Sequence, residues 1–141
     1  MQKQYEMALK MRDRVNDVHS AVLQIREARA ALEAARNGGD SAKLQAIDAV
    51  EQKMAAVEEE LTQVKSTNLS AALVYPIMLD AQYADLGNVI ESSDSAPPAQ
   101  VYDVFQDYER KRQDLSAKWK ALQPEVAQLE KGTQVQSGAL R

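Results

Sequence analysis

Residues 11–32 read MRDRVNDVHSAVLQIREARAAL, and this stretch decides the fold because its apolar side chains recur at steps of three and four residues. That spacing places them on one face of an α-helix, whose period is 3.6 residues. A second stretch, residues 47–64, repeats the pattern. The two stripes consist of Met11, Val15, Val18, Val22, Ile25 and Leu32, and of Ile47, Val50, Met54, Val57, Leu61 and Val64. The sequence therefore predicts amphipathic helices that pack through apolar stripes.

Helix breakers divide the chain into four helical segments. The first helix is predicted at about residues 3–37 and ends before Gly38, because glycine adopts the left-handed backbone that closes a helix. Asp40 or Ser41 then caps a second helix at about residues 42–65. Because the connection is so short, these two helices are predicted to form an antiparallel hairpin.

The second half of the chain is predicted to hold a shorter and a longer helix. The shorter helix runs over about residues 76–92, with Pro76 in its first turn, and the longer helix over about residues 98–131. Pro124 lies within the longer helix and predicts a kink or a break near residues 120–123. The inward stripes are predicted to be Leu79, Tyr83, Leu86 and Ile90, and then Val101, Phe105, Tyr108, Leu115, Trp119, Leu122, Val126 and Leu129.

Together these features predict an all-α protein, an antiparallel up-down-up-down four-helix bundle with long first and fourth helices and a shorter third helix. Residues 1–132 are predicted to form a single domain, and residues 133–141 a frayed tail. Gly87 indicates a close approach between two helices, since glycine has no side chain. The ends of the long helices are expected to project past the bundle. The expected interaction surface on the projecting end of the first helix consists of Tyr5, Met7, Ala8 and Met11.

The composition narrows the classes of function. The chain has 141 residues, of which 45% are hydrophobic and 27% charged, so it is long enough to fold as one soluble domain. A formal net charge of -4 argues against a nucleic-acid partner, which requires clustered Lys and Arg. The absence of cysteine excludes disulfides and thiolate chemistry. No apolar run reaches the length of a membrane span, and the first residues lack the apolar core of a signal peptide, so no membrane insertion is expected.

The residues that carry chemistry do not form a catalytic or metal-binding pattern. His19 is the only histidine, which excludes a di-metal carboxylate site and predicts a side chain on a helix flank. The acidic run 58–60 and the basic run 110–112 each spread around a helix, and both are interpreted as solvated faces. No serine stands in a nucleophile setting. The sequence therefore predicts no catalytic residue, no cofactor and no metal.

Two arginines occupy positions on the apolar stripes. Arg29 lies between Ile25 and Leu32, and Arg112 lies between Tyr108 and Leu115. A buried arginine must be paired, and such a pair would fix the register of the helices. Alternatively the aliphatic stems cover the seam while the charged groups reach water, or the arginines recognise a ligand. The carboxylates considered as partners are Asp80, Asp85 and Asp107.

Aromatic residues gather on the third and fourth helices and are interpreted as core packing rather than as a cofactor site. They are Tyr75, Tyr83, Tyr102, Phe105, Tyr108 and Trp119.

Four stretches resemble the C-terminal helical region of large bacterial exported proteins that carry sortilin-type or Asp-box β-propeller repeats and are often labelled glycosyl hydrolase-like. These stretches are QYEMALKMRD at 4–13, VLQIREAR at 22–29, LVYPIML at 73–79 and SSDSAPPAQVYDVF at 92–105. The resemblance implies that the chain is one domain of a larger extracytoplasmic protein, either periplasmic or secreted. It implies no catalytic residue here, because none of the propeller repeats occurs in this chain.

The sequence therefore leads to the hypothesis of a non-catalytic helical bundle that serves as an interaction, oligomerisation or packing domain of a larger β-propeller, glycosyl hydrolase-like protein. Its expected partner is a second copy of the chain or the propeller domain in cis. The alternative hypothesis is an independent helical binding module, an adaptor or a protein with an apolar-ligand pocket near Tyr83, Phe105 and Trp119.

Overall fold

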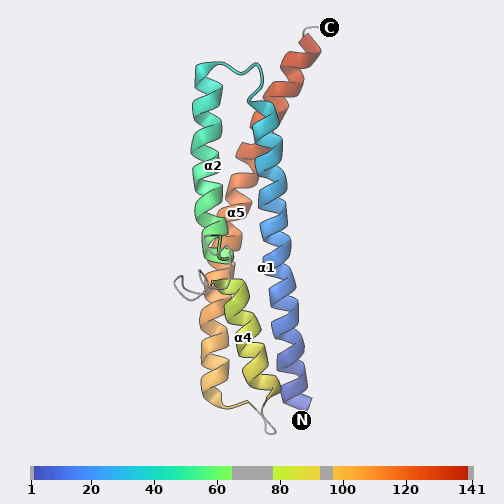
Figure 1. The fold of residues 1–141 in the computed structure, drawn as a ribbon, viewed down its shortest axis with the longest axis vertical. Helices are drawn as coiled ribbons and strands as arrows, with labels where there is room; N and C mark the ends of the chain where they lie inside the picture. The colour runs from blue at the N-terminus through green and yellow to red at the C-terminus, as the bar shows by residue number, and fades with distance from the viewer. Residues whose placement is uncertain (1, 65–77, 93–96, 140–141) are drawn as a thin grey trace.

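The chain forms an all-α four-helix bundle with long first and last helices and a shorter third helix, as the sequence predicts (Figure 1). The computed structural model describes residues 2–64, 78–92 and 97–139. The helices are α1 (Gln2–Ala35), α2 (Ser41–Leu61), α4 (Leu79–Glu91) and α5 (Ala99–Ala139).

The connection between α1 and α2 contains the left-handed glycine and the N-cap residue that the sequence predicts. Gly38 has a φ of 76°, the left-handed conformation that glycine adopts most readily. Asp40 is the N-cap of α2, and its side chain accepts a hydrogen bond from the Lys43 backbone N–H at 2.8 Å. α2 therefore turns back antiparallel to α1, and Arg36 near the end of α1 pairs with Asp48 near the start of α2.

The predicted alternation of helix direction is wrong for the third helix. Gln4 at the start of α1 donates a hydrogen bond to the carbonyl of Ile90 at the end of α4, at 2.7 Å. His19, halfway along α1, lies 3.2 Å from Asp80 in the first turn of α4. α4 is therefore antiparallel to α1, as α2 is, and the order of directions is up-down-down-up (Figure 1).

The lengths of the helices explain this path. α1 has 34 residues, whereas α2 and α4 have 21 and 13, so the two shorter helices placed end to end match α1, about 50 Å at 1.5 Å per residue. α2 covers the second half of α1 and α4 covers the first half. If α4 turned back beside α2, the apolar residues of the first half of α1 would stay in water, at roughly 25 cal/mol for each Å² left exposed.

The core contains the predicted stripes together with Met7, Ala8 and Ala35 of α1. The stripe residues of α1, α2, α4 and α5 are buried, except that Val15, Tyr108 and Leu129 are partly buried and Val64 is 39% exposed. Val64 is exposed because α2 ends at Leu61, short of the predicted end near residue 65. Gly87 is buried in α4, and a Cβ built on it would lie 3.1 Å from the Met11 Cβ, in agreement with the predicted close approach.

The helix ends differ from the prediction in the second half of the chain. α4 begins at Leu79 with Met78 as its N-cap, and Pro76 lies outside the described residues. α5 passes through Pro124 without a break and extends to Ala139 rather than ending near residue 131. The predicted frayed tail therefore overlaps the last turns of α5, which project past the α1–α2 connection in Figure 1. No helix among the described residues is long and apolar enough to cross a membrane.

Candidate functional site

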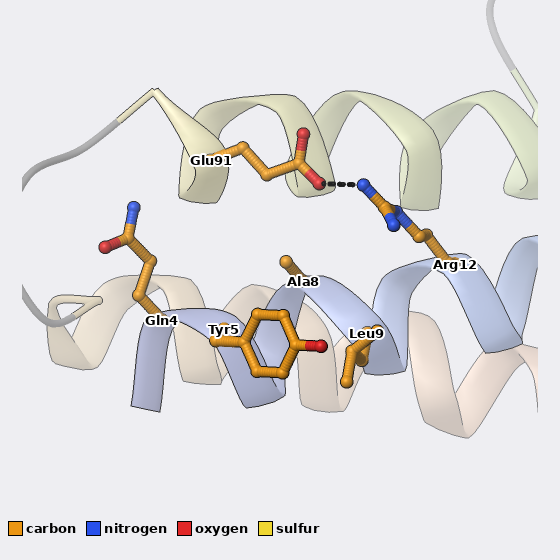
Figure 2. A pocket seen from close by; sticks show the side chains of 6 residues that line it. All are labelled: Gln4, Tyr5, Ala8, Leu9, Arg12 and Glu91. Atoms are coloured by element: carbon orange, nitrogen blue, oxygen red, sulfur yellow. Dashed lines mark hydrogen bonds and ion pairs between the residues drawn. The ribbon is translucent and has the colours of Figure 1, made fainter. Parts of the chain in front are cut away.

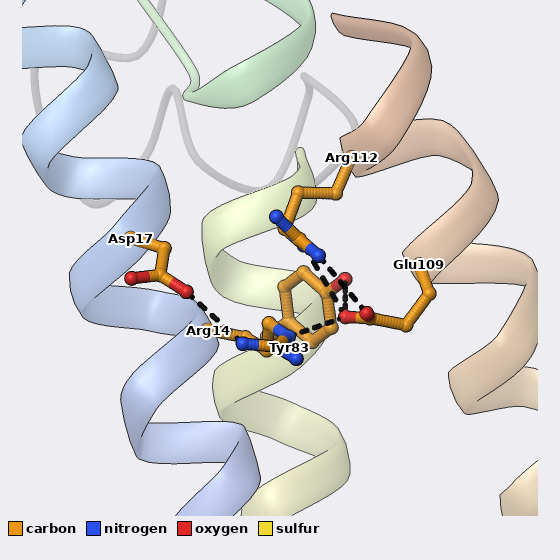
Figure 3. A network of polar contacts seen from close by, with 5 residues as sticks. All are labelled: Arg14, Asp17, Tyr83, Glu109 and Arg112. Atoms are coloured by element: carbon orange, nitrogen blue, oxygen red, sulfur yellow. Dashed lines mark hydrogen bonds and ion pairs between the residues drawn. The ribbon is translucent and has the colours of Figure 1, made fainter. Parts of the chain in front are cut away.

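The carboxylate of Glu109 accepts hydrogen bonds from three residues at the place where α1, α4 and α5 meet. Glu109 Oε1 accepts hydrogen bonds from Arg14 Nε at 2.6 Å and from the Tyr83 hydroxyl at 2.8 Å. Arg112 approaches the same carboxylate with Nη2 3.0 Å from Oε2 and Nε 3.3 Å from Oε1. Arg14 also pairs with Asp17 at 3.1 Å. We call these five residues the Glu109 network (Figure 3).

Burial and hydrogen bonding act in opposite directions on the pKa of Glu109. Burial alone would raise the pKa of Glu109, but the hydrogen bonds from Arg112, Tyr83 and Arg14 outweigh it and hold the pKa below the ordinary value. Glu109 in turn raises the pKa of Arg112 by its hydrogen bond. Burial, and then the hydrogen bond to Glu109, raise the pKa of Tyr83. The hydrogen bonds of the network therefore favour the ionised forms of Glu109 and Arg112.

A second buried carboxylate joins α1 to α2. Glu58 is 4% exposed, so the prediction of a solvated face for the acidic run is wrong at this residue, although Glu59 and Glu60 are exposed. Its Oε1 accepts a hydrogen bond from Arg26 Nε at 2.7 Å, and its Oε2 lies 3.1 Å from Arg29 Nη2. This position is buried because Glu58 lies four residues after Met54 and three before Leu61, on the stripe itself.

The carboxylates first considered as partners of the two stripe arginines are not the ones that pair with them. Arg29 lies against Glu58, and Arg112 lies against Glu109 three residues earlier on the same helix. Asp80 instead accepts a hydrogen bond from the Thr62 hydroxyl at 2.8 Å and lies beside His19, which is exposed on the flank of α1 as predicted. Asp85 is exposed, and Asp107 pairs with Arg110.

The sequence contained a signal for both buried glutamates. Glu109 lies four residues after Phe105 and three before Arg112, which places it on the α5 stripe just as Glu58 lies on the α2 stripe. A search for stripe positions occupied by either sign of charge would have found them. Which arginine meets which glutamate depends on the register between helices, and that register is a tertiary property.

Three of the four residues predicted for a projecting surface are in the core. Met7, Ala8 and Met11 are 4%, 8% and 1% exposed, because α4 lies along the first half of α1. Only Tyr5 is exposed, at 65%.

Tyr5 nevertheless belongs to an apolar surface at this end of the bundle. It lines a hollow of about 250 Å³ with Leu9, Ala8 and Gln4 of α1. Figure 2 shows Tyr5 and Leu9 side by side on α1, with the ion pair between Arg12 and Glu91 at the far side of the hollow. We call Tyr5 and Leu9 the N-terminal patch.

Three of the aromatic residues, Tyr83, Phe105 and Tyr108, pack against one another. The ring of Tyr83 meets those of Phe105 and Tyr108 edge to face, with centroids 6.3 and 5.6 Å apart. Trp119 lies farther along α5, where its indole N–H donates to Gln24 Oε1 at 3.0 Å. Tyr75 lies outside the described residues.

The fold and its polar contacts define a class of protein, an all-α helical bundle whose helices are joined by arginine–glutamate pairs. The described side chains contain no group of three or more His, Cys, Asp or Glu placed to hold a metal ion. No family model matches the chain, and no match was found among curated proteins or solved structures.

Proposed function

We propose that this chain is a non-catalytic helical bundle that serves as an interaction, oligomerisation or packing domain of a larger β-propeller, glycosyl hydrolase-like protein. The observation that carries the proposal is the N-terminal patch. Tyr5 is 65% exposed and Leu9 is 38% exposed, and both border an apolar hollow. Adjacent exposed apolar side chains support a role in protein interaction, because contiguous apolar surface marks such sites.

The location of the patch favours packing in cis. Tyr5 and Leu9 lie within the first three turns of α1, which begins at Gln2. A domain joined ahead of α1 would adjoin them directly. Ion pairs also join α1 to α2, α4 and α5, so the patch lies on a helix that contacts each of the other three.

The reading frame upstream of Met1 provides the first test. The proposal expects the coding sequence to continue into β-propeller repeats, whereas a stop codon and a ribosome-binding site there would overturn the proposed parent protein.

Hydrogen exchange provides the second test. It compares the isolated bundle with the protein that carries the β-propeller ahead of the bundle, which we call the joined protein. The backbone amides of residues 5–12 should exchange more slowly in the joined protein than in the isolated bundle, because a docked domain excludes water and restrains the end of α1. Tyr5→Ser together with Leu9→Ser should remove this difference while the isolated bundle stays folded, with a modest loss of melting temperature because Leu9 is partly covered. Leu23→Ser is the matched control, since Leu23 is 58% exposed on α1 but lies outside the patch. Equal exchange in the joined and isolated proteins would contradict packing in cis.

A further inference from the structure

The outer face between α2 and α5 is an apolar groove that no other described helix covers. Because α2 and α4 follow one another along α1, three helices rather than four pack side by side at the level of α2 (Figure 1). Two adjoining hollows of about 360 and 410 Å³ lie along this face. We call it the α2–α5 groove. It is lined by the exposed Ala46, Ala49, Ala56 and Ala121 and floored by the buried Val57 and Leu122.

The small residues of the groove make a close approach possible. The distance between two packed helix axes, 8 to 10 Å in general, depends on the side chains at the contact, and alanine allows the shorter distances. A second pair of helices laid on this face would therefore contact Val57 and Leu122 as well as the alanines. Covering these side chains supplies the apolar part of an interface.

Four charged side chains stand at the corners of the 360 Å³ hollow. Lys53 of α2 lies 3.8 Å from Glu125 of α5 at one end. Glu60 is two turns after Lys53 on α2, and Lys118 is two turns before Glu125 on α5, and both line the same hollow. Because α2 and α5 are antiparallel, Glu60 and Lys118 stand at the other end. Charges of the same sign are therefore diagonal to one another.

This diagonal arrangement is complementary to itself. When two identical faces meet about a two-fold axis parallel to the helices, Lys53 faces Glu125 of the second copy, and Glu60 faces Lys118. With the axis across the helices, Lys53 faces Glu60 and Lys118 faces Glu125. Every corner meets the opposite charge in either case, whereas a partner of one dominant sign would meet repulsion at two corners.

We infer that the α2–α5 groove is the interface between two copies of this chain. The inference rests on the proposed role as an interaction domain and names one partner for it, a second copy. The face extends about 21 Å along α2 from Ala46 to Glu60, which places the interface at the small end of specific interfaces. Lys118 is already paired with Asp114 at 3.2 Å, so a further pair across the interface adds little binding free energy. The four charges therefore determine the orientation of the two copies more than the strength of their association.

Sedimentation equilibrium of the purified chain over a concentration series tests the inference. The expected result is a reversible change from the mass of one chain, 15.6 kDa, to twice that mass. Lys53→Glu with Lys118→Glu makes all four corners negative and should weaken dimerisation about tenfold or more. Glu60→Lys with Glu125→Lys makes all four positive and should weaken it as strongly. An equimolar mixture of these two double variants should form a heterodimer.

Two controls make the result specific to the groove. Lys10→Glu with Lys111→Glu changes the net charge equally at exposed residues outside the groove and should leave dimerisation unchanged. Circular dichroism melting should show that every variant stays folded, because all six positions are exposed. A monomer at all concentrations would overturn the inference, and so would a negative variant that dimerises as tightly as the control. Neither result alters the exchange test of the N-terminal patch, so failure here is distinguishable from failure of packing in cis.

Discussion

Tyr83 donates a hydrogen bond of 2.8 Å from its hydroxyl to Glu109, and this contact ties α4 to α5 in the interior of the bundle. Tyr83 is fully buried, and the two arginines that also reach Glu109 come from α1 and α5. One carboxylate thus joins three helices. We expect its removal to affect the whole bundle.

Glu109→Ala should lower the free energy of unfolding by about 3 to 5 kcal/mol, because it leaves Arg14 and Arg112 without their shared carboxylate in a partly buried position. Tyr83→Phe removes only one hydrogen bond and leaves the ring packing, so about 1 to 3 kcal/mol is expected. Urea denaturation followed by circular dichroism measures both. If Glu109→Ala were no more destabilising than Tyr83→Phe, the ion pairs of the network would not contribute to stability.

The Glu109 network should also make the stability depend on pH. Because the pKa of Glu109 is held below its ordinary value of 4.5, the carboxylate contributes stability above that value and loses it as the pH falls through the folded-state pKa. The difference in unfolding free energy between the wild-type chain and Glu109→Gln should therefore shrink between about pH 6 and pH 3. Other carboxylates titrate in both proteins and cancel in this comparison. A difference that stays constant would mean that the pKa of Glu109 is not lowered by folding.

Gly87→Val should destabilise the bundle by about 1 to 3 kcal/mol through overpacking against α1. A Cβ at this position lies 3.1 Å from the Met11 Cβ, which is fixed to the backbone of α1, so the two helices must separate. Asn88→Val, one residue later and exposed, is a control for the helix propensity of valine. Thermal melting of both variants tests the contact, and equal melting temperatures would contradict it.

Val22→Asp or Val57→Asp should unfold the chain. The two valines are 4% and 3% exposed, and an unpaired charge in such a seam costs several kcal/mol against a total stability of roughly 5 to 15 kcal/mol. Far-ultraviolet circular dichroism should show the loss of helical signal. Leu23→Asp introduces the same charge at a side chain that is 58% exposed and should retain the fold.

Asp80→Ala should loosen the junction of α2 and α4 by about 1 to 2 kcal/mol. Asp80 accepts a hydrogen bond from the hydroxyl of Thr62 at the end of α2. It also lies in the first turn of α4, where a negative charge stabilises the helix through the helix dipole. Hydrogen exchange should accelerate at the first turns of α4 and the last turn of α2. Unchanged exchange at both sites would show that Asp80 does not hold the junction.

The sequence by itself determined the helices and their inward faces. Stripes such as Ile47 to Leu61 and Leu79 to Ile90 are buried as the three- and four-residue spacing predicts, because the period of an α-helix is a local property. The left-handed Gly38 and the Asp40 cap were likewise readable from single residues. Local chemistry does not reveal in which direction a helix leaves a connection.

Only the tertiary structure decided the path of α4 and what it covers. Because α4 continues in the direction of α2, it covers the apolar face of the first half of α1, and Met7 and Met11 are core residues. The same path leaves the α2–α5 groove without a covering helix among the described residues. The same register brought Arg14 to Glu109 and Arg29 to Glu58, pairs 95 and 29 positions apart in the chain. Helix propensity and stripe spacing act within a helix, whereas these choices depend on the area buried and the charges matched between helices.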